Sequence, residues 1–188
     1  MQKKNRLWII IFVLAAVSLA CNLSIFSPKT PAPPIPVTTE SVQSLEETAQ
    51  NAYNDFQQSG TVKLTITEAQ LTSLVAMKLA ESGDQTITDP QVYLRDGKIQ
   101  VFGTVKTDNL EAKAEVIVGV GVDSSGQPDF NIESAKLGPF PLPDNLISQL
   151  ETRLDLIFQQ EIASLAPNTA IDSIQIADGQ MVIEGHQR

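Results

Sequence analysis

Cysteine and histidine are almost absent from this chain of 188 residues, which has one of each, Cys21 and His186. A single cysteine cannot form an intrachain disulfide. Zinc sites built on cysteines and catalytic pairs of the Cys–His or Ser–His type are also disfavoured. His186 stands two residues before the end, where chains fray, so we expect a solvated tail residue. These shortages argue against most enzyme classes.

Positive charge is scarce as well. The chain has 13 Lys and Arg against 22 Asp and Glu, a net charge of −9. Loss of Lys3, Lys4 and Arg6 with a cleaved signal leaves 10 basic against 22 acidic residues, or about −12. Such a protein repels phosphate backbones, so we expect no nucleic-acid binding. Direct docking on anionic lipid headgroups is disfavoured for the same reason.

Known catalytic motifs are missing. The sequence has no glycine-rich phosphate loop, no HExxH or GxSxG pattern and no calcium-loop spacing. Its aspartates suit turns and helix caps, as at Asp96 and Asp144. Two carboxylates brought together by folding, as in glycoside hydrolases, remain the one enzymatic alternative. We therefore expect a protein that is not an enzyme and that uses no cofactor or metal.

Residues 1–20 have the layout of a secretory signal, because three basic residues precede an uncharged, mostly apolar run over 7–20. That run is short for a bilayer span. The segment Ser18-Leu19-Ala20-Cys21 resembles a bacterial lipoprotein signal, although in that family the leucine usually stands one place earlier. The resemblance implies cleavage before Cys21 and acyl chains on that residue. An uncleaved anchor and ordinary secretion are the alternatives.

A proline-rich segment follows the cysteine, with five prolines in the ten residues 27–36. Proline favours the extended polyproline II conformation, which rises about 3.1 Å per residue. We expect residues 21–39 to be the lipidated cysteine and a semi-rigid tether that spans roughly 50 Å. A proline-rich ligand for a partner domain is the alternative. Residues 40–188 are then expected to form one folded domain.

The first part of the domain predicts two helices around a short strand. Apolar residues recur at steps of three and four over 40–59, and 61–66 alternates as a strand does. The pair Thr67 and Gln70 forms a capping-box pattern at the start of a second helix, which Gly83 ends. That helix has an apolar face, which consists of Leu71, Leu74, Val75 and Leu79.

The sequence of the rest of the domain predicts two hairpins, a long strand and a long helix. Residues 91–102 form a hairpin around an Asp-Gly turn, and strands follow over 110–123 and 129–137. Three prolines make 138–143 an irregular connection. Residues 144–166 predict an amphipathic helix of roughly 33 Å.

The C-terminal hairpin around residues 174–185 repeats the pattern of the first hairpin at an offset of 82 residues. Each copy follows an amphipathic helix. We expect two related helix-and-hairpin units that share one sheet, although Asp-Gly turns also recur by chance.

The fold class that these elements predict is α+β. We expect a long, curved antiparallel sheet with the helix over 144–166 packed along its concave face. Apolar positions on the strands and on this helix are the candidates for a buried or groove-lining surface. They are Ile99, Val101, Val116, Val118, Val120, Leu146, Leu150, Leu154, Ile157 and Phe158.

Three stretches, 64–74, 92–103 and 137–143, together resemble the LmeA-type and YpmS-like extracytoplasmic proteins, which are related to the TULIP-like lipid-binding folds. The similarity covers about residues 60–188. It implies a single TULIP-like module in which a curved sheet wraps a long helix around a groove for acyl chains. The matching stretches are fold signatures, so no individual site residue is carried over.

The functional expectation is a lipoprotein tethered to the membrane of a bacterial cell envelope, with its domain facing away from the cytoplasm. The membrane, through its anchor, and a lipid or fatty-acyl ligand are the expected partners. The alternative is a ligand-free envelope scaffold that binds other proteins, with an exposed apolar patch near 139–143.

Overall fold

The computed structural model describes residues 33–83, 85–107, 110–152, 169–177 and 179–188. Along the chain these form α2 (Thr39–Ser59), β1 (Thr61–Thr67), α3 (Glu68–Ser82), β2 (Ile87–Arg95), β3 (Lys98–Thr107), β4 (Leu110–Val122), β5 (Pro128–Leu137), β6 (Phe140–Pro141), a helix over 144–152, β7 (Thr169–Ala177) and β8 (Gln180–Gln187). The α+β class and the predicted order of elements are confirmed.

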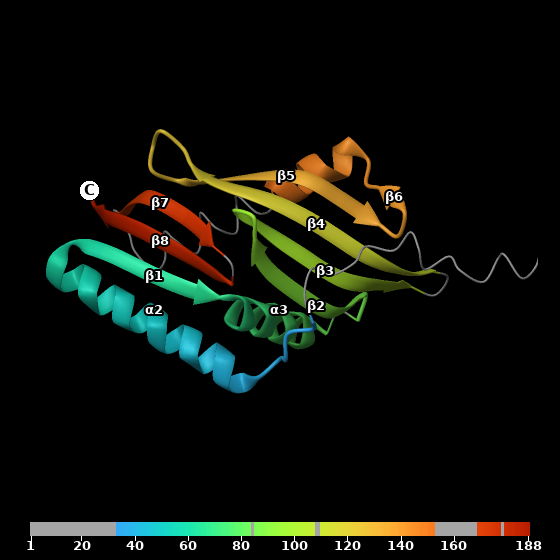
Figure 1. Ribbon diagram of the computed structural model, residues 1–188, viewed down its shortest axis with the longest axis horizontal. Helices are drawn as coiled ribbons and strands as arrows, with labels where there is room; N and C mark the ends of the chain where they lie inside the picture. The colour runs from blue at the N-terminus through green and yellow to red at the C-terminus, as the bar shows by residue number, and fades with distance from the viewer. Residues whose placement is uncertain (1–32, 84, 108–109, 153–168, 178) are drawn as a thin grey trace, which may run out of the picture.

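The strands form two antiparallel sheets that lie beside each other along the long axis (Figure 1). One has the order β1-β8-β7 and the other the order β2-β3-β4-β5-β6. The expectation of one sheet shared by two hairpin units is therefore wrong. The two hairpins do meet, because the backbone N–H of Gly179 in the second turn donates to the carbonyl of Leu94 at 3.0 Å. That bond does not continue into a strand ladder.

Local sequence signals set the ends of the N-terminal elements. Thr67 caps α3 with the complete capping box, in which its side chain accepts from Gln70 N and the Gln70 side chain accepts from Thr67 N. Gly83 ends the helix with a left-handed conformation. In the first hairpin, Asp96 and Gly97 both have positive φ angles of 54° and 73°, as a type I′ turn requires. These three predictions are confirmed.

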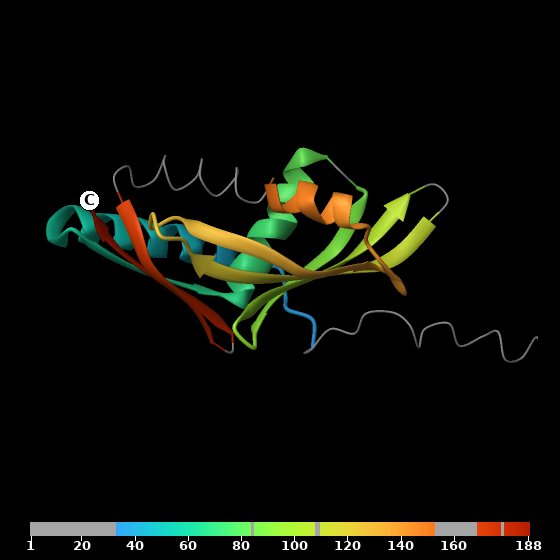
Figure 2. The same ribbon diagram turned by 90° about the horizontal axis from the view of Figure 1, so that it is seen from above.

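The helices lie on one side of the sheets. Figure 2 shows α2, α3 and the helix over 144–152 above the strands, while the two hairpin turns point to the opposite side. Among the described residues the longest helix is α2, with 21 residues, so in this part of the chain the dominant helix is not one in the C-terminal half. Of the helix predicted over 144–166, residues 153–166 lie outside the described part of the chain.

Two clusters of buried apolar side chains form the core. One lies where the two sheets meet under α2 and α3, around Ile66, Leu94 and Met181. The other lies on the five-stranded sheet under the helix over 144–152, around Val118, Phe130, Ile132 and Ala135. Ile99 packs against both clusters, so they are continuous through β3.

Candidate functional site

The candidate site is the apolar face of the five-stranded sheet under the helix over 144–152. Strand register places Ile99 opposite Val118 and Val101 opposite Val116, so the four side chains share one face. Val120, opposite Phe130 on β5, extends this face. The five strand residues that the sequence proposed as groove-lining therefore do come together.

The helix meets this face through Ile147, which packs against the buried cluster together with Leu142. Leu146 and Leu150 were expected to be buried or to line a groove. They are not buried, with exposures of 42% and 38%, because the helix turns Ile147 rather than these leucines toward the sheet. Both line a hollow beside the helix instead. Leu154, Ile157 and Phe158 lie outside the described residues.

A hollow of about 680 Å³ lies beside the helix over 144–152. Three leucines line it together with polar helix residues: Leu142, Leu146, Ser148, Gln149, Leu150 and Thr152. Leu142 also contacts the cluster under the helix, so the hollow adjoins the apolar face of the sheet. Three leucines and three polar helix residues therefore form the described lining, and no charged side chain is among them.

Helix carboxylates accept backbone N–H groups from the edge strand β2 and from the part of β5 that β6 does not pair with. Glu151 accepts the backbone N–H of Ile132 on β5 at 2.9 Å, which fixes the helix over 144–152 to the sheet. On the edge strand β2, Glu68 of α3 accepts the N–H of Leu94 at 2.7 Å. Unpaired strand edges otherwise attract other chains, so these contacts favour a self-contained sheet.

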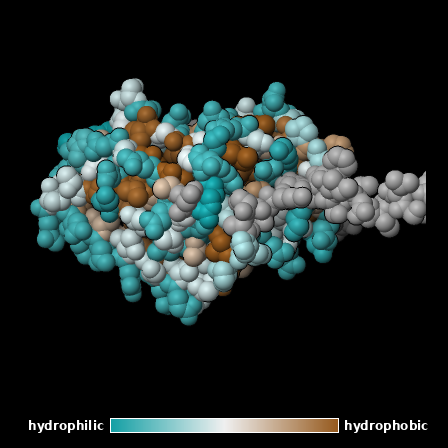
Figure 3. Space-filling model, viewed as in Figure 1, coloured by the Kyte–Doolittle hydropathy of each residue, from teal (hydrophilic) through white to brown (hydrophobic). Residues whose placement is uncertain are grey.

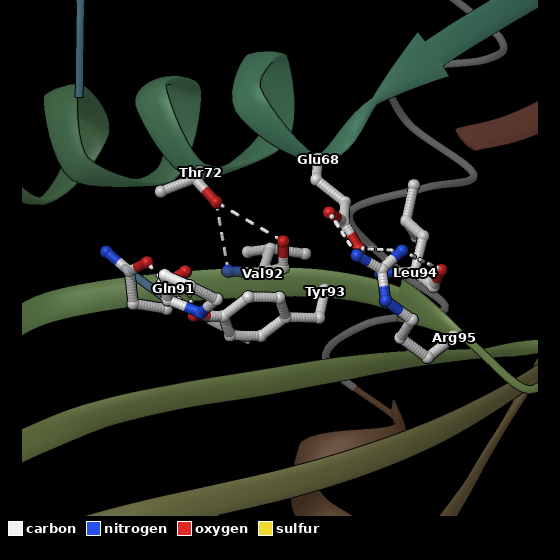
Figure 4. A network of polar contacts seen from close by, with 8 residues as sticks. Glu68, Thr72, Gln91, Val92, Tyr93, Leu94 and Arg95 are labelled. Carbon is white, nitrogen blue, oxygen red and sulfur yellow. Dashed lines mark hydrogen bonds and ion pairs between the residues drawn. The ribbon is translucent and has the colours of Figure 1, made fainter. Parts of the chain in front are cut away.

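The β2 edge carries a larger polar network, shown in Figure 4. The Thr72 hydroxyl accepts from Val92 N at 3.0 Å and lies 3.3 Å from Val92 O, to which it donates. Glu68 also forms an ion pair with Arg95 at 2.7 Å, with side-chain exposures of 13% and 27%. The side-chain oxygens of Thr72 and Glu68 all have partners in this network, which therefore serves as a structural link between α3 and β2.

This network determines which residues of α3 are buried. The residues that α3 buries are Gln70, Thr72 and Ser73, whereas Leu71, Leu74, Val75 and Leu79 are only half-buried. The buried polar side chains bond to α2, to β2 and to the backbone of Thr38. Sequence periodicity missed this face because it ranks residues by hydropathy and takes no account of a strand edge that needs partners.

The segment before α2 also contacts the domain. Gln91 and Tyr93 of β2 bond to the backbone of Ile35 and Pro33, and Ser73 accepts from Thr38 N. Residues 33–38 therefore lie against the folded part, although we expected the whole of 21–39 to be a tether. No sequence signal marks Gln91 as a contact for this segment. Cys21 lies outside the described residues.

A second hollow, of about 590 Å³, lies between the end of α2 and the three-stranded sheet. It is lined by polar residues that include Asp55, Lys63, Asp172 and Glu184. His186, expected to be a frayed tail residue, belongs to β8 and its Nδ1 lies 2.7 Å from Asp172. Within the described ranges, no group of three or more His, Cys, Asp or Glu side chains is placed to hold a metal ion.

On the face that Figure 3 shows, hydrophobic side chains form separate patches between hydrophilic ones. In the part of the chain that the structure describes, no helix is both long enough and apolar enough to cross a membrane. The chain matches no protein-family model, no curated protein and no solved structure.

Proposed function

We propose that this protein is a membrane-tethered extracytoplasmic lipoprotein that binds or carries lipid-like apolar ligands. The observation that carries the proposal is the apolar face of β3 and β4 beside a leucine-lined hollow of about 680 Å³. Ligand sites are typically concave, mostly apolar and about 300–1,000 Å³ in volume. In this proposal the fold is a single TULIP-like module, with the helix over 144–152 beside the groove.

The remaining support comes from the sequence. The lipoprotein-type signal places acyl chains on Cys21, and the proline-rich segment holds the domain outside the membrane. The protein acts in the cell envelope, without catalysis, without a cofactor and without nucleic acid. The acidic net charge of −9 fits this picture, because it favours attachment by acyl chains over attachment by a basic surface.

Native mass spectrometry of the purified protein, followed by extraction and identification of any bound lipid, tests the proposal. Uptake of a fluorescent fatty acid gives a second measurement. We expect the double variant Leu146→Gln and Leu150→Gln to lose most of the uptake. Ile87→Gln is the matched control, because Ile87 is equally exposed, at 40%, but lies on β2. A wild-type protein that carries no lipid and takes up no fatty acid or phospholipid contradicts the proposal.

One observation favours the second candidate, a ligand-free envelope scaffold. Phe140 is 72% exposed and stands between two prolines on the short strand β6, where that candidate expects an apolar patch. Exposed aromatic residues are common anchors in protein interfaces. For a scaffold, Phe140→Ser weakens crosslinking to a partner protein, and neither the wild type nor the variant takes up fatty acid. For a lipid carrier, the double leucine variant is the one that changes the measured activity.

A further inference from the structure

Residues 33–38 are held on the domain by side chains from β2 and α3. The amide of Gln91 bonds to both backbone groups of Ile35: its Oε1 accepts from Ile35 N at 2.6 Å, and its Nε2 donates to Ile35 O at 3.3 Å. The Tyr93 hydroxyl donates to Pro33 O at 3.2 Å and also lies 3.4 Å from Gln91 Oε1. Thr38 N donates to Ser73 Oγ at 3.1 Å.

The chemistry of these contacts matches an extended, proline-rich chain. Prolines at 33, 34 and 36 leave three backbone N–H groups in residues 33–38, those of Ile35, Val37 and Thr38. Two of the three donate to side chains of the domain. A side-chain amide that bonds to both the N–H and the C=O of one residue makes the same pair of bonds that a neighbouring strand makes. Proline lowers the entropy lost when such a segment is held.

The anchoring side chains are firmly placed. Tyr93 and Ser73 are fully buried, and the Tyr93 ring contacts Phe102 edge-on at a centroid distance of 5.8 Å. Alternation along β2 puts Tyr93 on the opposite face from its neighbours Val92 and Leu94, which pair with Val101 and Ile99. The segment is therefore tied to the face of the sheet away from the helix over 144–152. Figure 2 shows the first described residues below the strands and that helix above them.

We propose that residues 33–38 form a latch, held by Gln91, Tyr93 and Ser73, that fixes where the tether leaves the domain and how far the domain stands from the membrane. The consequence for reach rests on the membrane anchor of the proposed function. With the latch closed, the tether before it consists of residues 22–32, and a polyproline II chain of that length spans about 34 Å. With the latch open, residues 22–38 span about 50 Å. The latch itself lies on the face of the sheet away from the apolar face and its hollow.

Hydrogen exchange of the full chain in detergent tests the latch without using the anchor. The peptide that covers residues 33–38 has few backbone amides, so its exchange reports on these amides alone. We expect the amides of Ile35 and Thr38 to be protected from exchange in the wild type. In the double variant Gln91→Ala and Tyr93→Phe, the protection factor of the Ile35 amide should fall at least tenfold. Gln175→Ala is the matched control, because Gln175 is an exposed glutamine on β7. Unchanged protection of α3 and β3 shows that each variant is folded.

A second variant changes only the latch segment and none of the residues that hold it. It therefore tests the latch even if the double variant on β2 unfolds. Replacement of Pro33, Pro34 and Pro36 by serine should lower the protection at Ile35, because the freer segment loses more entropy when held. The proposal is overturned if Ile35 exchanges freely in the wild type, or if its protection survives the double variant in a folded protein.

Fluorescence energy transfer measures how far the domain stands from the membrane. A donor dye on Glu47→Cys, an exposed position of α2, and an acceptor lipid in phosphatidylcholine vesicles give the height of the domain. We expect less transfer when the latch is opened in the double variant, and unchanged transfer in the Gln175→Ala control. If the height does not change, the role of the latch in reach is wrong. If the vesicles do not hold the wild-type protein, the anchor is wrong, while hydrogen exchange still decides the latch.

Discussion

The carboxylate of Glu68 accepts the backbone N–H of Leu94 at 2.7 Å, so a helix side chain occupies the place of a neighbouring strand at the edge of β2. Gly179 N donates to Leu94 O at 3.0 Å, and Glu68 N donates to Gly179 O at 3.1 Å. Leu94, Glu68 and Gly179 therefore close a ring of bonds that joins α3 to both hairpins. The two sheets are connected at this point by single hydrogen bonds rather than by a shared ladder.

The variant Thr72→Val tests the hydrogen bonds that the Thr72 hydroxyl makes to Val92 at the edge of β2. Valine has nearly the same shape, but it leaves Val92 N without its bond in a fully buried place. We expect the free energy of unfolding to fall by about 1–3 kcal/mol in a urea titration. Thr48→Val on α2 is the control, because Thr48 makes only an exposed bond to Ser44 O, and it should change stability by less than about 0.5 kcal/mol. Equal effects of the two variants would contradict this role of Thr72.

Glu68 has two roles that two substitutions separate. Glu68→Gln keeps an acceptor for Leu94 N and removes the charge that pairs with Arg95. We expect it to cost about 1 kcal/mol, because the pair is partly open to solvent. Glu68→Ala removes both contacts and should cost about 2–3 kcal/mol. Thermal and urea unfolding measure both, and a glutamine variant as unstable as the alanine variant would show that the ion pair dominates.

Ile147 and Leu146 are adjacent on one helix and should differ in their effect on stability. Ile147 packs against the cluster around Val118, whereas Leu146 is 42% exposed. We expect Ile147→Ala to lower the free energy of unfolding by about 1–2 kcal/mol, since the site is only partly buried. Leu146→Ala should change it by less than about 0.5 kcal/mol and should lower fatty-acid uptake instead. The opposite order in stability would show that the helix presents its other stripe to the sheet.

Asp123 makes the turn between β4 and β5 sensitive to acid. Its pKa lies below the ordinary value of 3.8, mainly because Gln127 N donates to the carboxylate and also because Ser125 does. A carboxyl with a lowered folded-state pKa adds stability above its unfolded pKa, and this stability is lost as the pH falls through the folded value. We expect Asp123→Asn to lower Tm at pH 7 and to reduce the fall in Tm between about pH 5 and pH 2.5. Asp129→Asn, an exposed aspartate on β5, is the control, and the same loss of pH sensitivity in that variant would contradict the assignment.

Cys21→Ser tests the anchor. The variant should take up no alkynyl fatty acid in metabolic labelling and should remain an uncut precursor, because the thiol is the acceptor of the acyl chain. Each buried CH₂ contributes about 0.8 kcal/mol, so more than one chain is needed for stable attachment. Thermal unfolding of the domain should not change. A wild type that stays in the membrane without label would show that residues 7–20 are an uncleaved anchor.

The sequence by itself determined the elements whose signals are local. The capping box at Thr67, the left-handed stop at Gly83 and the Asp96-Gly97 turn depend on neighbours a few residues away, and all three are observed. The strand candidates for the site also followed from the sequence. A period of two places Ile99 and Val101 on one face of β3, and register with β4 then aligns them with Val118 and Val116.

Only the tertiary structure decided what lies at the edges of the strands. Gln91, Thr72 and Glu68 appear in the sequence as ordinary polar residues, and hydropathy assigns them to solvent. Their partners stand 56, 20 and 26 residues away, and the need for these side chains arises only when β2 becomes an edge. A buried backbone group without a hydrogen-bond partner costs free energy, so the polar side of α3 faces the edge of β2 and bonds to it. With this edge covered by α3, the strands form two sheets instead of one. This arrangement depends on contacts between segments far apart in the chain, and no local sequence pattern predicts it.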